Sequence, residues 1–214
     1  MIFRLDERLL FPEPSLAEED GLLALGGDLS VDRLLLAYQN GIFPWYNNDT
    51  PILWYSPHGR FVLFPDELKI SKSMKQVLRS RRFTITIDKS FEQVIEACAI
   101  AKREGQDGTW ITDDMKKAYI DLHHQGHAHS VEVWEKDQLV GGLYGAAVGL
   151  VFCGESMFSK VSNASKTALI TLCQSGKYQL IDCQVHTEHL ESMGARLISR
   201  KEYMNILKNA RAKS

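Results

Sequence analysis

The spacing of apolar and polar residues differs between the two ends of the chain. Residues 1–65 hold all six prolines and only short apolar runs, which predicts turns and short strands. One amphipathic helix is expected over 31–40, where Ser30 can cap the first turn and Gly41 can end the last. Beyond that part the apolar spacing changes repeatedly between the helical period and strand alternation. We therefore expect a small N-terminal domain over 1–65 and a larger domain over 66–214.

The larger domain is expected to combine helices and strands around one core. Residues that can cap a helix precede three of its segments: Ser71, Thr112, and Ser90, which forms a capping-box pattern with Gln93. Two more helices are predicted over 163–174 and from about 201. Strands are predicted at 83–87, 130–134, 139–147, 149–153, 178–185 and near 197. This order, with a central antiparallel meander, indicates an α+β fold with α/β-like alternation.

Composition and charge describe an ordinary globular chain with one unusual segment. Apolar residues make up 44% of the 214 residues and the formal net charge is −2, so nothing global indicates a nucleic-acid binder. Residues 69–82 nevertheless contain six Lys and Arg and no acid. Within them Lys72, Lys75 and Arg79 share one face of the predicted helix. That face suits a phosphate backbone and equally suits a solvated surface, and the spacing does not decide between them.

The cysteines and the apolar runs bear on the compartment. The four cysteines form no Cys-x-x-Cys pair and sit in apolar segments, which predicts buried thiols and a reducing compartment. The first ten residues are interrupted by charges, unlike a signal peptide. No run of about 18 apolar residues occurs, so no transmembrane helix is expected. A cytoplasmic protein without a membrane partner is the prediction.

Four histidines lie close together in the sequence, at His123, His124, His127 and His129. No cysteine or acid joins them at the spacing of metal ligands. We therefore predict no metal site there.

A carboxylate and an amide stand two residues apart in the strand predicted over 178–185. Asp182 and Gln184 should project to one face, while Ile181, Cys183 and Val185 face the core. Polar groups inside an apolar strand need hydrogen-bond partners. The pair suits either the handling of an amine or a buried structural hydrogen bond, and the residues alone leave both open.

Three long motifs carry a resemblance to a known family. They are GLLALGGDLS at 21–30 with YQNGIFPWY at 38–46; GTWIT at 108–112 with HAHSVEVW at 127–134; and FCGESMFS at 152–159 with NASKTAL at 163–169 and LIDCQV at 180–185. Together, and in this order, they resemble the leucyl/phenylalanyl-tRNA–protein transferases along nearly the whole chain.

The resemblance implies a fold and a reaction. The family's larger domain resembles the GCN5-related acyltransferase fold. Its partners are aminoacyl-tRNA carrying leucine or phenylalanine, with methionine as a third candidate, and proteins that begin with arginine or lysine. The α-amine of such a protein attacks the ester to the tRNA, and the product carries an N-terminal degradation signal. The family implies no metal, ATP or organic cofactor, and we expect a monomer.

The resemblance also implies roles for individual residues. Asp182 would hold or deprotonate the amine, Gln184 would relay or orient, and Glu155, expected just past a strand, would be a second acid near the cleft. Which acid meets the amine and which meets the acceptor side chain stays open. Trp45 is the implied platform for the terminal adenine.

Other residues are implied with weaker or shared roles. Trp110 and Tyr38 are weaker candidates for the same adenine. Five residues would line the pocket for the transferred side chain, or simply form core: Leu143, Phe152, Met157, Leu169 and Leu172. The basic face of Lys72, Lys75 and Arg79 would contact the tRNA backbone.

Two other functions fit parts of the sequence. A GCN5-like acetyltransferase should show a glycine-rich turn for pyrophosphate before the helix at 163–174, but the turn at 159–165 has no glycine. A non-catalytic RNA-binding module would explain the basic face but would leave Asp182 and Gln184 unexplained.

Overall fold

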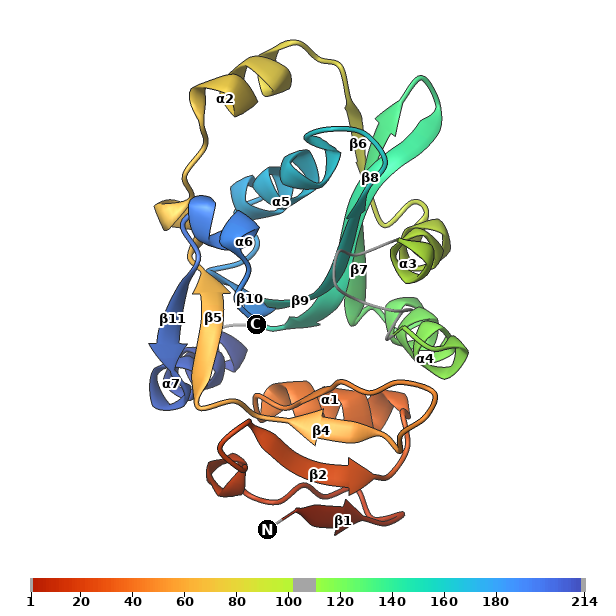
Figure 1. Ribbon diagram of the computed structural model, residues 1–214, viewed down its shortest axis with the longest axis vertical. Coiled ribbons are helices and arrows are strands. Elements are labelled where there is room, and N and C mark those ends of the chain that lie inside the picture. Colours follow the sequence, from red (N-terminus) through yellow and green to blue (C-terminus); the bar gives the residue numbers. More distant parts are fainter. Residues whose placement is uncertain (1, 102–110, 213–214) are drawn as a thin grey trace.

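The computed structural model describes residues 2–101 and 111–212 and contains two sheets (Figure 1). The smaller sheet has the strand order β1-β2-β4-β3. Its strands are β1 Phe3–Leu5, β2 Leu22–Gly26, β3 Phe43–Pro44 and β4 Leu53–Tyr55. The helix α1, Val31–Gln39, runs beside this sheet on the side that faces the rest of the molecule.

The larger sheet has seven strands in the order β11-β5-β10-β9-β8-β7-β6. In chain order they are β5 Gly59–Leu63, β6 Thr84–Ile87, β7 Ala128–Glu135, β8 Gln138–Val148, β9 Val151–Ser159, β10 Leu180–Gln184 and β11 Arg196–Ser199. The described helices of this part are α2 Lys72–Arg79, α3 Phe91–Ile100, α4 Asp113–His124, α5 Ala164–Gln174, α6 Glu188–Ser192 and α7 Arg200–Arg211. The mixed helices and strands confirm the α+β prediction.

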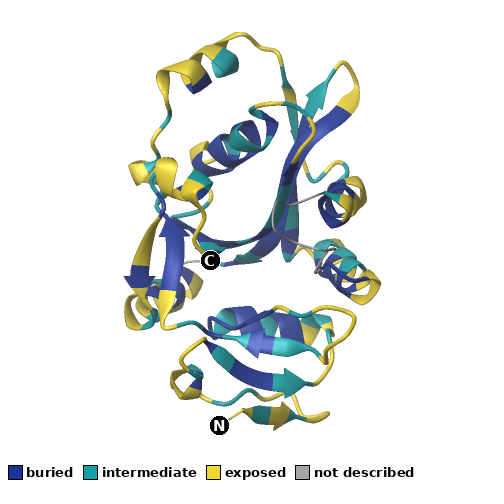
Figure 2. Ribbon diagram, viewed as in Figure 1, coloured by how far each residue is buried: buried dark blue, intermediate teal, exposed yellow. Residues whose placement is uncertain are grey.

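Helices cover both faces of the larger sheet. α5 lies against one face, while α3 and α4 lie against the other (Figure 1). Two apolar clusters result, one around α5 and one shared by α1, α3, α4 and α7. Figure 2 shows α5 as mostly buried and α2 as mostly exposed. The larger sheet therefore separates two apolar cores. A cavity that passes between its strands would contact both.

Most predicted helix starts are confirmed, and one capping prediction is wrong. The hydroxyls of Ser30, Ser71 and Thr112 each accept a hydrogen bond from the backbone N–H three residues on. Ser90 precedes α3, but its side chain makes no capping bond. Its backbone N–H instead donates to the buried Glu132 carboxylate, so a tertiary contact replaces the expected local one.

Two strands differ from their predicted extents at candidate site residues. β9 continues to Ser159, so Glu155 lies within a strand and is buried instead of following it. β10 ends at Gln184, which has a positive φ of 60°, and Val185 is 51% exposed instead of facing the core. A left-handed residue breaks the alternation of a strand, and alternation is what the sequence pattern assumes.

The boundary between the two parts falls near β5. β5 pairs with β10 and β11 in the larger sheet, whereas β4 still belongs to the smaller one. By sheet membership the change therefore lies between Tyr55 and Gly59. The division into 1–65 and 66–214 stays a prediction.

Candidate active site

A cavity opens where two neighbouring parallel strands separate. β9 and β10 pair only through Leu180–Asp182 and Val151–Cys153. Just beyond, each strand has a bulge: Glu155 has no partner on β8, and Cys183 has none on β5. A bulge inserts an extra residue, bends its strand and re-aims the side chains around it. The gap between the bent strands forms a cavity of about 260 Å³.

One part of this cavity is apolar and lies toward α5. All five residues predicted for the side-chain pocket line it: Leu143, Phe152, Met157, Leu169 and Leu172. Ile181 and Leu190 complete the lining on this side. Met157 is half-buried while Phe152 is fully buried, so the wall combines a flexible thioether with a fixed ring. Such a cavity accepts a branched or aromatic hydrocarbon group.

Glu155 lies at the polar end of the cavity. Its Oε1 accepts hydrogen bonds from the Tyr38 hydroxyl at 2.7 Å and from the Gln184 side-chain amide at 2.8 Å. Its Oε2 is buried without a hydrogen-bond partner among the residues that the structure describes. Burial raises the pKa of the Glu155 carboxyl to about 7, although the side chains of Tyr38, Tyr119 and Gln184 act in the opposite direction. Two donors thus hold one carboxylate oxygen, and none of the described residues donates to the other.

Asp182 also lines the cavity, but its carboxylate is fully engaged within the protein. Arg60 donates to both of its oxygens, at 2.8 to 3.0 Å. The Tyr203 hydroxyl donates at 2.8 Å and the Gln184 backbone N–H at 2.9 Å. The carboxylate is completely buried. The Arg60–Asp182 ion pair therefore stabilises the fold and also lies beside the cavity.

Arg60 is itself clamped from several sides. Its guanidinium lies 4.6 Å from the ring centroids of both Phe43 and Tyr203. Its Nη1 donates to the Gly41 carbonyl oxygen at 3.2 Å. The segment after α1 therefore reaches the same buried ion pair that orders β10.

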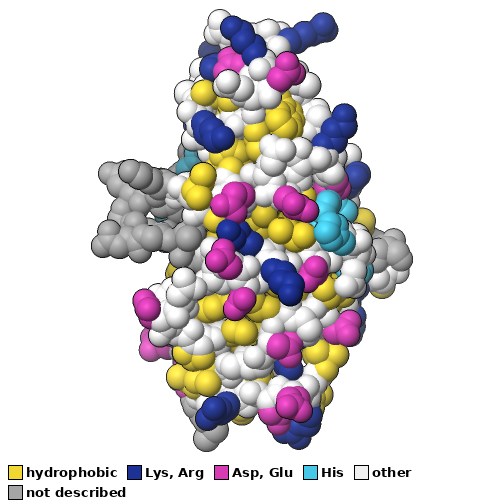
Figure 3. Space-filling view, turned by 90° about the vertical axis from the view of Figure 1, so that its right-hand side faces the viewer, with side chains coloured by type: hydrophobic (Ala, Val, Ile, Leu, Met, Phe, Trp, Pro, Cys, Tyr) yellow, Lys and Arg dark blue, Asp and Glu magenta, His cyan; other side chains and the backbone are white. Residues whose placement is uncertain are grey.

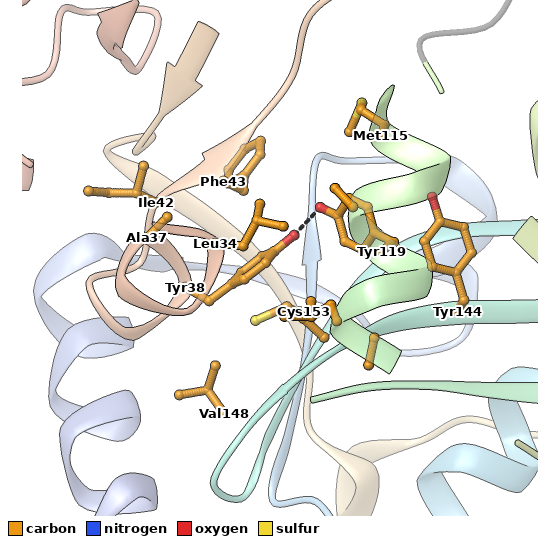
Figure 4. Close-up of a cluster of buried hydrophobic side chains, with 14 of the residues drawn as sticks. Leu34, Ala37, Tyr38, Ile42, Phe43, Met115, Tyr119, Tyr144, Val148 and Cys153 are labelled. Atoms are coloured by element: carbon orange, nitrogen blue, oxygen red, sulfur yellow. Dashed lines mark hydrogen bonds between the residues drawn. The ribbon is translucent and has the colours of Figure 1, made fainter. Parts of the chain in front are cut away.

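The aromatic candidates occupy different environments. Trp45 lines the cavity, is 40% exposed and meets Tyr55 edge-to-face with ring centroids 5.8 Å apart. Its free face can stack on a base. Tyr38 was a weaker candidate for such stacking, but its ring is 1% exposed in the core shown in Figure 4. Core packing leaves it no face for a base, and its hydroxyl holds Glu155 instead. Trp110 lies outside the described residues.

The basic residues of α2 lie on the surface, as their spacing predicts. Lys72, Lys75 and Arg79 are exposed, while Met74 turns inward to the core around α5. α2 lies at one end of the molecule in Figure 1, and none of its residues lines the cavity.

Sequence reasoning missed Arg60, Tyr119 and Tyr203, which support the site. Arg60 is the second residue of the apolar strand β5, where a lone charge is unusual enough to suggest a buried partner. The two tyrosines gave no comparable signal, because a tyrosine on the apolar face of a helix is ordinary core.

Comparison with known proteins decides the family. A family model described as leucyl/phenylalanyl-tRNA protein transferase matches residues 62–208. A second, described as the N-terminal domain of the same enzyme, matches residues 27–58. The chain is 56% identical to the leucyl/phenylalanyl-tRNA–protein transferase of Flavobacterium johnsoniae, over 97% of this chain and 100% of that one.

The chain belongs to the leucyl/phenylalanyl-tRNA–protein transferase family. It is therefore an aminoacyltransferase. The enzyme of that name from Syntrophobacter fumaroxidans is 57% identical over 96% of this chain and 89% of its own. Among solved structures, a GCN5-related N-acetyltransferase from Kribbella flavida matches 75% of this chain and 58% of its own, at 10% identity and a TM-score of 0.38. None of the helices in the described part of the chain has the length and apolarity needed to cross a membrane.

Proposed function

We propose that this transferase moves leucine or phenylalanine from aminoacyl-tRNA to the α-amine of proteins that begin with arginine or lysine. Methionine is a third candidate for the transferred residue. The amine nitrogen attacks the ester carbonyl carbon and a new amide bond forms. The bond from that carbon to the ribose oxygen breaks, and the tRNA leaves with a free hydroxyl after receiving a proton. The new apolar N-terminus would mark the product for degradation.

The observation that carries this proposal is the cavity between β9 and β10. Its apolar part has the chemistry of a leucine or phenylalanine side chain, and its polar end holds Glu155, Gln184 and Asp182. The reacting carbonyl must lie between an apolar side chain and an amine. The cavity offers an apolar region for the side chain and, next to it, a polar region for the amine.

Glu155 is the acid that we assign to the amine. A free α-amine has a pKa of roughly 7.7–8.0, so much of it enters as an ammonium group near neutral pH. A carboxyl with a pKa of about 7 is matched to remove that proton, because neither direction of transfer is strongly uphill. Its Oε2 also carries no competing hydrogen bond among the described residues.

Asp182 and Gln184 complete the polar end in supporting roles. Asp182 accepts from Arg60, Tyr203 and the Gln184 backbone, which fixes the end of β10. Gln184 has its side-chain nitrogen on Glu155, so its carbonyl oxygen is the acceptor that it offers to an amine.

The donor is proposed to bind on the other side of the reacting carbonyl. Trp45 would stack on the terminal adenine at the cavity mouth. Lys72, Lys75 and Arg79 would contact phosphates farther along the tRNA. We further propose a monomeric enzyme working in the cytoplasm, where the free thiols of Cys153, Cys173 and Cys183 would stay reduced.

The decisive test is a transfer assay with leucyl-tRNA labelled in the leucine. The acceptors are three peptides of equal length that begin with arginine, with glutamate, or with N-acetylated arginine. We expect label in the arginine peptide only, because the acetylated one lacks a nucleophile. Tight retention of the tRNA without transfer would favour the RNA-binding alternative. Acetylation of the peptide from acetyl-CoA would favour the acetyltransferase.

A further inference from the structure

Three buried hydroxyl and carboxyl groups form a chain that reaches Glu155 from two helices. Tyr38 of α1 donates to Oε1 of Glu155 on β9. The Tyr38 hydroxyl also contacts the hydroxyl of Tyr119 on α4, and Figure 4 shows the two hydroxyls pointing at one another. Tyr38 has one proton and gives it to Glu155. When Glu155 is ionised, Tyr119 is therefore the donor in the contact between the two tyrosines.

This chain is not required for packing. The Tyr38 and Tyr119 rings lie in the same apolar core, where phenylalanine would fill nearly the same space. Tyr119 also packs edge-to-face on Tyr144, at 5.6 Å between ring centroids, and that contact needs no hydroxyl. Placing two hydroxyls and a carboxyl together in a core is costly unless each is satisfied. We therefore attribute the two hydroxyls to the hydrogen-bond chain that ends at the Glu155 carboxylate.

The chain also selects one oxygen of Glu155. Both donors to this carboxylate, Tyr38 and Gln184, bind Oε1. Oε2 has no such partner in the described ranges 2–101 and 111–212. Two hydrogen bonds thus fix the position of Oε1, and they thereby also fix the direction in which Oε2 points. A residue that strengthens the Tyr38 bond strengthens this orientation.

We propose that Tyr119 is a positioning residue for the transfer reaction, which acts through Tyr38 to hold the Glu155 carboxylate with Oε2 available to the incoming amine. This inference rests on the proposed role of Glu155. Tyr119 touches neither substrate in it. Its hydroxyl polarises Tyr38, and the polarised Tyr38 is a stronger donor to the ionised carboxylate.

The ionisable groups around Glu155 do not mask its titration. Burial raises the pKa values of both tyrosines and of the nearby Cys153 thiol well above their usual range, so all three stay protonated near neutral pH. Burial raises the pKa of Glu155 most, and the hydroxyls of Tyr38 and Tyr119 lower it. The titratable and charged groups that face Glu155 are Tyr38 from α1, Tyr119 from α4, Tyr144 from β8, Cys153 on β9, and Asp182 from β10 with its partner Arg60 from β5.

The test is the pH profile of Tyr119→Phe, which removes one hydroxyl and keeps the ring. Without that donor the ionised carboxylate is less stabilised, so the pKa of Glu155 rises. The midpoint of the rate should move to higher pH by roughly one half to one. At pH 6 the variant should be about 3- to 10-fold slower than wild type, and at pH 9 the two should nearly agree. Taking the ratio of the two rates cancels the titration of the acceptor amine.

Tyr46→Phe is the matched control. The Tyr46 hydroxyl contacts Thr112, the residue that caps the same helix α4, at 3.2 Å. Removing it takes one hydrogen bond from the start of α4 and involves neither Tyr38 nor Glu155. Its pH midpoint should equal that of wild type. Thermal melting of both variants checks that neither has unfolded.

A direct titration separates this inference from the proposed function. Glutamate carboxyl carbons are labelled with carbon-13, and the Glu155 signal is assigned by its loss in Glu155→Gln. We expect its titration midpoint to rise in Tyr119→Phe. If Glu155→Gln abolishes transfer but the Glu155 midpoint is the same in wild type and Tyr119→Phe, the role of Tyr119 is overturned alone. If the midpoint rises but the rate profile stays unchanged, both that role and the role of Glu155 are overturned.

Discussion

Glu155 lies in a buried strand. Its burial lowers the stability of the protein and also shifts the pKa of its carboxyl toward the range needed for proton transfer. Burial raises the pKa of its carboxyl to about 7, whereas the unfolded chain has a value near 4.5. The protein therefore loses stability as the pH rises from the unfolded pKa to the folded pKa of Glu155, because the carboxyl ionises first in the unfolded chain. The cost is complete above about pH 7. The same shift brings the carboxyl to the pH at which it exchanges a proton with an amine.

Glu155→Gln should therefore be inactive and more stable. The amide can keep the hydrogen bonds from Tyr38 and Gln184, but it cannot accept a proton. Transfer should fall by about 100-fold or more. At pH 8 the free energy of unfolding should rise by roughly 1–3 kcal/mol, and this gain should vanish at pH 4. Urea titrations at the two pH values measure it. Undiminished transfer by the folded variant would rule out Glu155 as the proton acceptor.

Trp45 is a second residue whose role can be isolated, because its ring is 40% exposed. Trp45→Ala should weaken the aminoacyl-tRNA donor by about 5- to 150-fold, which corresponds to roughly 1–3 kcal/mol of lost stacking. Trp45→Phe should retain part of the affinity. Donor titrations at a fixed acceptor concentration measure both, and melting curves should match wild type. A large drop in melting temperature would instead make Trp45 a core residue.

At the scale of elements, one buried ion pair joins three of them. Arg60 of β5 binds Asp182 of β10, and Tyr203 of α7 both donates to Asp182 and packs on Arg60. The smaller part of the chain adds the Gly41 carbonyl and the Phe43 ring. This pair lies beside the bulge that opens the cavity, so it stabilises the fold and the site together.

Asp182→Asn should accordingly destabilise the protein as well as impair transfer. It leaves the Arg60 charge buried without a counter-ion, which typically costs about 3–5 kcal/mol. Denaturant unfolding measures the loss. A variant that folds with wild-type stability and yet fails in transfer would indicate that Asp182 takes part in the chemistry directly. In that case the assignment of the amine to Glu155 would have to be reversed.

At the scale of the whole molecule, charge is mixed on one face and concentrated at one end. Acidic and basic side chains are both scattered over the face shown in Figure 3. The basic run 69–82 lies around α2 at one end of the molecule, and none of its residues lines the cavity. A protein with net charge −2 can bind a polyanion only through such a local patch. The proposed donor therefore spans from the cavity mouth toward α2.

Replacing Lys72, Lys75 and Arg79 together with glutamine tests this path. The slope of log affinity against log salt concentration is roughly −0.7 to −0.9 per phosphate contact. The triple variant should flatten that slope by about two to three and weaken all tRNAs alike. Transfer from a minimal donor such as phenylalanyl-adenosine should persist, because that molecule cannot reach α2. An unchanged slope would show that α2 is only a solvated surface.

Local patterns in the sequence determined most of the elements and the family. Alternation and capping residues located α1, α2, α4 and α5 closely, because those signals act within a few neighbouring residues. The motifs also identified residues that lie together in the fold, since all five pocket candidates line one cavity. Their chemical roles stay predictions.

Only the tertiary structure decided how the acids differ. The bulges at Glu155 and Cys183 depend on strand pairing between distant segments, so no local pattern announces them. The same holds for Arg60, which is 122 residues from Asp182 in sequence, and for Tyr119, which meets Tyr38 across 81 residues. Burial and partners set the protonation of a carboxyl, and both arise only when the chain is folded.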